Sequence, residues 1–182
     1  YRHKVINPAR RALLNTHLDN SIPQTSSVAW RSFAPMFGST GIASMNTNGC
    51  SGNGTCHVFM DSLQARSYLW TYMAGGGSDT SCAYPVMSSS QCINLNLNTV
   101  FMQLYGSYFV EWAKGGITGT TNHLLRAPLA NAGMPLTTCW TGGGPRWYFH
   151  HMGLGETIGF STMQSQNNTG IYDPGNNQWL GG

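Results

Sequence analysis

The stretch YLWTYMAGGGSD, residues 68–79, carries most of the information about the fold class. It is a continuous apolar run that stops at three glycines. Two later stretches have the same form: TVFMQLYGSYF at 99–109 is interrupted near its end by a glycine, and LTTCW at 136–140 is followed by TGGGP. Short apolar runs with glycines toward their carboxyl ends are typical of strands buried in a parallel sheet. We therefore predict three such strands.

Helical patterns alternate with these strands. TSSVAWRSFAPMFG at 25–38 begins with residues that cap helices and ends at Gly38, so we predict a helix there. NHLLRAPLANAG at 122–133 and GLGETIGFSTMQSQN at 153–167 are further helical segments. Alternating strands and helices predict an α/β domain, a three-layer sandwich around a mostly parallel sheet, as a single domain over 1–182.

Two segments are less regular. RRALLNTHLD at 10–19 contains a short apolar segment of uncertain type, and the Gly-, Asn- and Ser-rich residues 39–57 are predicted to be an insertion loop. The glycine turns AGGGSD and TGGGP could cradle an anion through backbone N–H groups, although neither carries the lysine of a phosphate-binding loop. Steric need for glycine at strand ends is the simpler interpretation.

Composition limits the class of function. Charged residues make up only 8% of the 182 residues, and the net charge is +3. The few basic residues form no dense stripe, so we expect no nucleic-acid partner. No apolar run is long enough to span a bilayer. A surface built from Asn, Ser, Thr and Gly resists self-association poorly, which favours an extracellular or cell-surface protein that is assembled or anchored.

The five cysteines are compatible with that location. Cys50 and Cys56 flank a polar loop, as do Cys82 and Cys92, so two short-range disulfides with a free Cys139 form one plausible pairing. Other pairings, and buried reduced thiols, remain open. Glycosylation sequons begin at Asn53 and Asn167.

The stretch WYFHHMGLGETIGF at 147–160 concentrates titratable groups. His150, His151 and Glu156 are candidate metal ligands or catalytic groups, but adjacent histidines point in different directions, and helical zinc ligands prefer a spacing of three or four. The preferred interpretation has one histidine buried and bonded to a carbonyl or to Glu156. Glu156 is then expected to pair with Arg126 or Arg146.

Two further features point to partners or cofactors. His57 directly follows Cys56, which gives a C-x5-C-H pattern related to haem attachment, but the usual spacing is shorter. His57 is therefore a third candidate metal ligand, although we expect no cofactor. Trp179 lies in a loop-like stretch and is a candidate contact with a neighbouring chain.

The order of several motifs resembles a known family. RRALLN, WRSFAPMFG, YLWTYMAGGGSDTSC, VFMQLYGSYFVEW, NHLLRAPLA and WYFHHMGLGETIGFSTMQSQNN, within about 9–170, are similar to the later part of gingipain-like (caspase-related) cysteine peptidase domains of large secreted or surface bacterial proteins. The resemblance implies a caspase-like sandwich, and it leaves open an abridged sheet. It also implies a catalytic histidine after one strand and a cysteine after the next, because a thiolate attacks and an imidazole takes its proton.

The chain departs from that family at both catalytic positions. The histidine should stand at Gly75 or Gly76, and the cysteine within residues 103–105, near Gln103. Neither residue type is present there, so the family's activity cannot be carried over.

Three hypotheses follow. The first is a secreted or surface-associated domain without the dyad, a pseudoenzyme that acts as a structural or assembly subunit with other copies of itself or the rest of a larger chain. The second is a cysteine peptidase that uses Cys82 or Cys139 with His150 or His151. The third is a metal- or haem-binding extracellular subunit. The missing dyad and the low charge favour the first.

Overall fold

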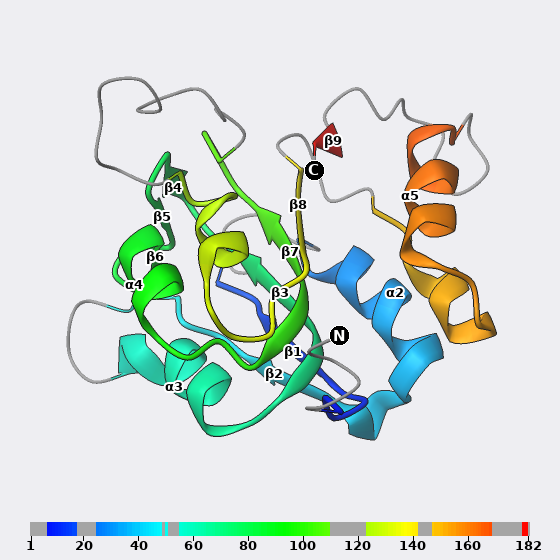
Figure 1. Ribbon diagram of the computed structural model, residues 1–182, viewed down its shortest axis with the longest axis horizontal. Coiled ribbons are helices and arrows are strands. Elements are labelled where there is room, and N and C mark those ends of the chain that lie inside the picture. Colours follow the sequence, from blue (N-terminus) through cyan, green and yellow to red (C-terminus); the bar gives the residue numbers. More distant parts are fainter. Residues whose placement is uncertain are drawn as a thin grey trace.

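A six-stranded sheet forms the centre of the molecule. In the computed structural model, the described residues are 7–17, 25–48, 50, 55–109, 123–141, 147–168 and 180–181. The strands of the sheet, in spatial order, are β2 (Ile42–Met45), β1 (Ala12–Asn15), β3 (Tyr68–Ala74), β7 (Thr99–Tyr105), β8 (Thr137–Thr141) and β9 (Leu180–Gly181). The first five are parallel and β9 is antiparallel, which confirms the predicted α/β class (Figure 1).

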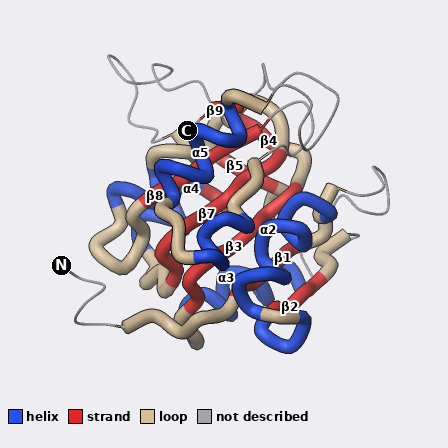
Figure 2. Tube along the Cα trace, turned by 90° about the vertical axis from the view of Figure 1, so that its right-hand side faces the viewer, coloured by secondary structure: helices blue, strands red, loops and turns tan. Residues whose placement is uncertain are grey.

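The two faces of the sheet bury different side chains. Alternation along β3 sends Trp70 and Tyr72 to one face and Met73 to the other. Because both faces are apolar, both must be covered, and helices do so. Strands β1, β3, β7 and β8 run side by side through the middle of the molecule, between these helices (Figure 2).

The first face is covered by α2 (Ser27–Phe37), by the short 3-10 helix η4 (His150–Leu154) and by α5 (Ile158–Gln166). Phe33 of α2 packs against Trp70, with ring centroids 5.5 Å apart. The helix ends where predicted, because Gly38 adopts φ 67° and its N–H bonds to the carbonyl of Ala34.

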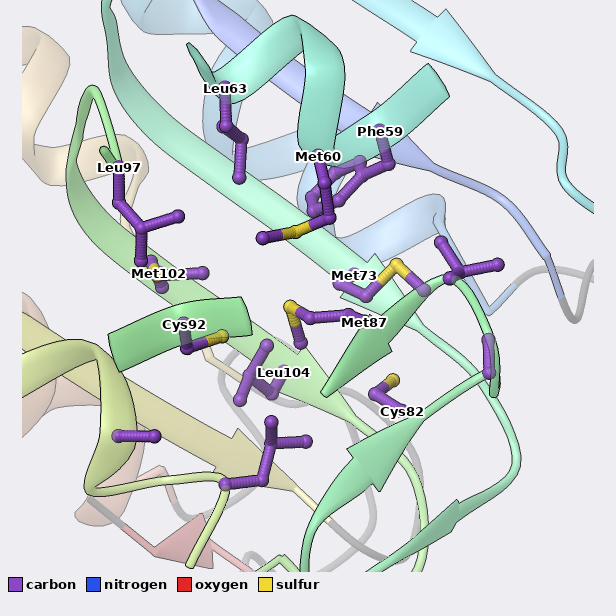
Figure 3. Packing of buried hydrophobic residues seen from close by; sticks show 14 of the residues in the cluster. Phe59, Met60, Leu63, Met73, Cys82, Met87, Cys92, Leu97, Met102 and Leu104 are labelled. Atoms are coloured by element: carbon purple, nitrogen blue, oxygen red, sulfur yellow. The ribbon is translucent and has the colours of Figure 1, made fainter. Parts of the chain in front are cut away.

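The opposite face is covered by α3 (Val58–Ala65) and α4 (Ser89–Asn94). Its core is rich in sulfur, with four methionines and two cysteines among the buried residues, as Figure 3 shows: Met60, Met73, Cys82, Met87, Cys92 and Met102. Methionine is flexible and adapts to irregular packing spaces, which suits a core shared by α3, α4 and a small neighbouring sheet. The three-layer arrangement is thereby complete.

The small sheet extends the first turn after β3. It consists of β4 (Gly77–Ser78), β5 (Ser81–Cys82) and β6 (Met87–Ser88), all antiparallel. Ser88 then caps α4, since its hydroxyl accepts the Gln91 N–H while the Gln91 side chain accepts from the Ser88 N–H. No helix in the described part of the chain is long and apolar enough to cross a bilayer.

Two sequence predictions about secondary structure were wrong. The predicted insertion loop, residues 39–57, contains β2 and two short 3-10 helices, η1 (Ser39–Gly41) and η2 (Thr55–His57). The predicted helix at 122–133 is reduced, within its described residues, to the 3-10 helix η3 (Ala127–Ala130), which contains a proline. Four residues suffice for β2 because its stability comes from pairing with β1, not from its own propensity.

Candidate functional site

Ligands of parallel sheets bind beyond the carboxyl ends of the strands, at the point where the strand order reverses. Here the chain moves from β1 to β2 on one side and then to β3 on the other, so the reversal lies between β1 and β3. A ligand site of this kind would therefore be built by the residues that follow β1, β3 and the next strand, β7.

A polar cluster follows β1 and β2. Asn15 is fully buried, and its Nδ2 donates to Thr47 Oγ1 at 2.9 Å, while the Thr47 hydroxyl donates back to Asn15 Oδ1 at 3.1 Å. His17 Nδ1 lies 2.9 Å from the same Thr47 oxygen. Because the single Thr47 proton is already given to Asn15, the His17 ring must donate from Nδ1. Its Nε2 then carries the lone pair, and no described residue bonds to that atom.

This cluster was missed by sequence analysis. It joins residues about 30 positions apart in the chain, as the Asn15–Thr47 separation of 32 shows. The polar residues 15–17 follow a segment whose type the sequence did not reveal, and nothing in their local pattern indicates contact with Thr47. Chemically, His17 Nε2 can accept a proton or a hydrogen bond from a ligand at this edge.

The residues after β3 and at the end of β7, where the sequence resemblance would put a catalytic dyad, lie side by side. Strands β3 and β7 are parallel neighbours, and beyond their ends the Gly75 N–H donates to the Tyr105 carbonyl at 3.0 Å. Gly75 and Gly76 carry no side chain, and Gln103 is a fully buried amide within the sheet. The two positions meet, but neither holds a nucleophile or a base.

These strand ends are packed closely. A Cβ on Gly75 would stand 2.4 Å from the Ala83 Cβ, and one on Gly106 would stand 2.1 Å from the Gly75 carbonyl oxygen. Gly76 differs, since nothing lies within 4 Å of a Cβ built there. The turn that contains Ala83 therefore closes the site at Gly75, and glycine is required for steric reasons.

His123, which sequence analysis did not single out, also lies at this edge. Its ring Nδ1 accepts the Leu125 N–H at 3.4 Å, so the proton must be on Nε2, which donates to the Tyr108 carbonyl at 3.0 Å. Both ring nitrogens are thereby bonded to the backbone. Tyr108 itself adopts φ 67°. His123 holds this strained turn in place rather than standing free as a base.

The cysteines divide into one disulfide and three thiols. Cys50 and Cys56 form the predicted disulfide. Cys82 and Cys92, candidates for a second pair, are free thiols, as is Cys139, in line with the alternative of buried reduced thiols. Cys82 and Cys92 both reach the sulfur-rich core, but from β5 and α4, and their sulfur atoms lie apart in Figure 3.

Burial disfavours the thiolate form of all three free cysteines. It raises the pKa of Cys82, with a smaller contribution from Cys92, and raises the pKa of Cys92 to about 12. The pKa of Cys139 is raised by the same cause. Because the thiolate is the nucleophile, a thiol that stays protonated is inert near neutral pH.

The proposed pairing of Cys82 with His150 or His151 is not realised. Cys82 packs on the α3 face of the sheet, whereas the two histidines lie in η4 on the α2 face. Cys139 is on the α2 face, where burial raises its pKa and so disfavours the thiolate that a nucleophile requires.

The stretch 147–160 proves to be an anchor between helices. Phe149 N–H donates to Ser32 Oγ of α2 at 3.1 Å, and Tyr148 N–H donates to Ser165 Oγ of α5 at 2.8 Å. His151 is buried and its Nδ1–H donates to the Tyr148 carbonyl at 3.2 Å, as the carbonyl interpretation expects.

The rings of His150 and His151 lie close together. Their ring centroids are 4.0 Å apart, and burial together with the His151 charge lowers the pKa of His150. Glu156 is exposed, precedes the α5 cap Thr157, and forms no ion pair with any described residue, including Arg126. Arg146 lies outside the described residues.

The remaining candidate ligand, glycosylation and contact residues lie apart from these clusters or outside the described residues. His57 ends η2 beside the Cys50–Cys56 disulfide, so neither of these cysteines is a thiolate ligand. No group of three or more His, Cys, Asp or Glu residues within the described ranges could hold a metal ion. Asn167 is exposed at the carboxyl end of α5, whereas Asn53, Trp179 and the glycines of TGGGP lie outside the described residues. Comparisons with models of known protein families, with curated proteins and with solved structures find no match to this chain.

Proposed function

We propose that this chain is a secreted or surface-associated domain with a caspase-like fold that lacks the catalytic dyad and serves as a structural or assembly subunit. Its partners are copies of itself or the remainder of a larger chain. The gingipain-like resemblance supplies the family expectation, and the state of the cysteines supplies the argument against peptidase chemistry.

One observation carries the proposal. All five cysteines of the sequence lie among the described residues: two form a disulfide, and three are buried with raised pKa values. A cysteine peptidase requires an accessible thiolate beside a histidine. The chain therefore offers no sulfur nucleophile in the folded state, whichever histidine is chosen as the base.

Two further features support export and assembly. The Cys50–Cys56 disulfide favours an oxidising compartment, where such bonds persist. The surface carries few charges, since only 8% of residues are charged, and charge repulsion opposes association only weakly. A domain of this kind is suited to permanent contact with neighbouring protein.

The peptidase alternative gives a sharp test. Folded protein is incubated with a library of Arg- and Lys-containing peptides, alongside Cys82→Ala and Cys139→Ala variants as matched controls. We expect no hydrolysis above background and no difference among the three proteins. Hydrolysis by the wild type that iodoacetamide abolishes and that one cysteine variant loses would overturn the proposal.

The assembly half of the proposal is tested separately. Sedimentation velocity over a wide concentration range should show reversible self-association that rises little when salt is added, because few charges have to be screened. If the chain stays monomeric and is also not bound by the purified remainder of its parent protein, the assembly role is refuted while the absence of catalysis still stands.

A further inference from the structure

A pocket opens between strand β8 and helix α5, on the α2 face of the sheet and away from the strand ends discussed above. Its volume is about 220 Å³. Its lining comes from β8, from the segment after it and from α5: Thr137, Thr138, Cys139, Trp147, Phe149, Ile158, Gly159, Thr162 and Gln166. None of these residues is charged, so the pocket is suited to a neutral ligand.

The floor of the pocket is apolar and aromatic. Cys139, Trp147 and Phe149 are 9%, 1% and 1% exposed. The Trp147 and Phe149 rings are nearly parallel, with an interplanar angle of 13° and centroids 5.7 Å apart. The Trp147 indole N–H is occupied by the Trp140 carbonyl at 3.0 Å. The rings therefore offer flat apolar surface rather than hydrogen bonds.

The mouth is open because α5 carries small residues above it. Gly159 and Gln166 are exposed, and Thr162 lies between them along the helix. A Cβ on Gly159 would meet only the Thr157 hydroxyl oxygen, at 3.8 Å, so a larger side chain has room there. Glycine inside a helix costs about 1 kcal/mol relative to alanine. Here it leaves the entrance unfilled.

An unsatisfied amide lies next to the floor. Gln103 is the register neighbour of Cys139 on the same face of the sheet. It is fully buried, and neither its Nε2 nor its Oε1 has a hydrogen-bond partner among the described residues. Buried polar groups normally have partners, so a donor and an acceptor remain unsatisfied beside an apolar floor.

We propose that this pocket binds a small, neutral, planar aromatic molecule with one polar group, of the size of phenol or indole. An apolar protein cavity of about 150 Å³ is large enough to hold benzene, which places one- and two-ring molecules within the available volume. The aromatic floor accommodates the ring, and the Thr162 or Gln166 side chain at the lining supplies a hydrogen-bonding group. The absence of charged residues from the lining selects against carboxylates.

Ligand-detected NMR and calorimetry with phenol, indole and benzoate test the site on the intact protein. We expect saturable one-to-one binding of indole or phenol, with benzoate bound roughly tenfold or more weakly because the pocket offers no cation. Intermolecular NOEs should connect the ligand to the Ile158 and Thr162 methyl groups. No saturable binding, equal affinity for benzoate, or NOEs confined to other residues would each overturn the proposal.

Gly159 supplies a matched pair of variants. Gly159→Phe should fill the entrance and lower the affinity for indole by about tenfold or more, whereas Gly159→Ala should leave it within about threefold, since a methyl group meets almost nothing there. Full affinity in a folded Gly159→Phe protein would refute the assignment. Should Gly159→Phe not fold, the NOE pattern of the wild-type protein still decides the question. The proposed assembly role does not depend on this outcome.

Discussion

Replacement of Gly106 by alanine should destabilise the protein strongly, because it places a methyl group in the closed junction beyond β3 and β7. Gly106 adopts φ 156°, outside the range that other residues readily adopt. The new Cβ would stand 2.1 Å from the Gly75 carbonyl oxygen and 2.7 Å from the Phe109 ring. Backbone strain of this kind costs roughly 1–3 kcal/mol, and overpacking costs roughly 1–3 kcal/mol more.

The two contributions predict a loss of about 2–6 kcal/mol in the free energy of unfolding for Gly106→Ala. For a domain of this length, that loss corresponds to a fall in Tm of about 5–25 °C. Urea unfolding followed by tryptophan fluorescence, with the disulfide intact, measures it. An unchanged m-value would show that the change lies in stability rather than in the compactness of the unfolded state.

Gly76→Ala is the matched control. Gly76 lies in the same turn region, but nothing is within 4 Å of its Cβ position. We expect a change within about 0.5 kcal/mol, as for other unconstrained surface sites. If Gly106→Ala is as stable as the wild type, or if Gly76→Ala is equally damaging, the strand ends are not closed in the way described.

Three further predictions concern the titratable groups and the disulfide. Burial raises the folded-state pKa of Cys92 to about 12, so this thiol stays protonated in the folded state while it ionises in the unfolded state. The stability that the neutral Cys92 thiol contributes to the folded state is fully present below about pH 9. Above that pH the free energy of unfolding should fall by about 1.4 kcal/mol per pH unit. Cys92→Ala should reduce this slope in urea titrations at alkaline pH. His150 has a lowered pKa in the folded state, so the free energy of unfolding should fall as pH drops below about 6.5. The His150→Gln variant should lose less stability over this range. If the wild type and the variant show the same dependence of unfolding free energy on pH, the structure is contradicted. Cys50→Ser opens a bridge between residues 6 positions apart and should lower the unfolding free energy by about 2 kcal/mol in urea melts.

The sequence was sufficient for the elements that carry a strong local pattern. The apolar runs at β3, β7 and β8 and the helix α2 were located to within a few residues. Each run combines apolar character with a glycine near its carboxyl end, and α2 ends at Gly38, although no side chain caps its start. These are local signals. The Cys50–Cys56 disulfide was equally local, since the two cysteines flank one short loop.

Elements that depend on distant partners were missed. Strand β2 lies in a Gly- and Asn-rich segment, and only its register with β1, from Ala12–Ile42 to Asn15–Met45, makes it a strand. The bonds of His17 to Thr47 and of His123 to Tyr108 likewise join separate loops. Such contacts follow from the tertiary fold, and no local pattern in the sequence encodes them.

The second candidate disulfide, between Cys82 and Cys92, does not form, for a related reason. Cys82 and Cys92 flank a loop much as Cys50 and Cys56 do, but β5, β6 and α4 intervene and direct both thiols into the methionine-rich core as separate packing groups. Spacing alone did not distinguish these two environments. The difference matters chemically, because burial in this core keeps Cys82 and Cys92 apart and favours their protonated form.

The state of the thiols is the most direct test of the account. Unreduced, folded protein is treated with iodoacetamide near neutral pH, and its intact mass is compared with that of the same protein alkylated in guanidinium. We predict no adduct on the folded chain and three on the unfolded chain, at Cys82, Cys92 and Cys139. A rapid single adduct on the folded chain, at any one of these cysteines, would contradict the claim that the domain has no sulfur nucleophile.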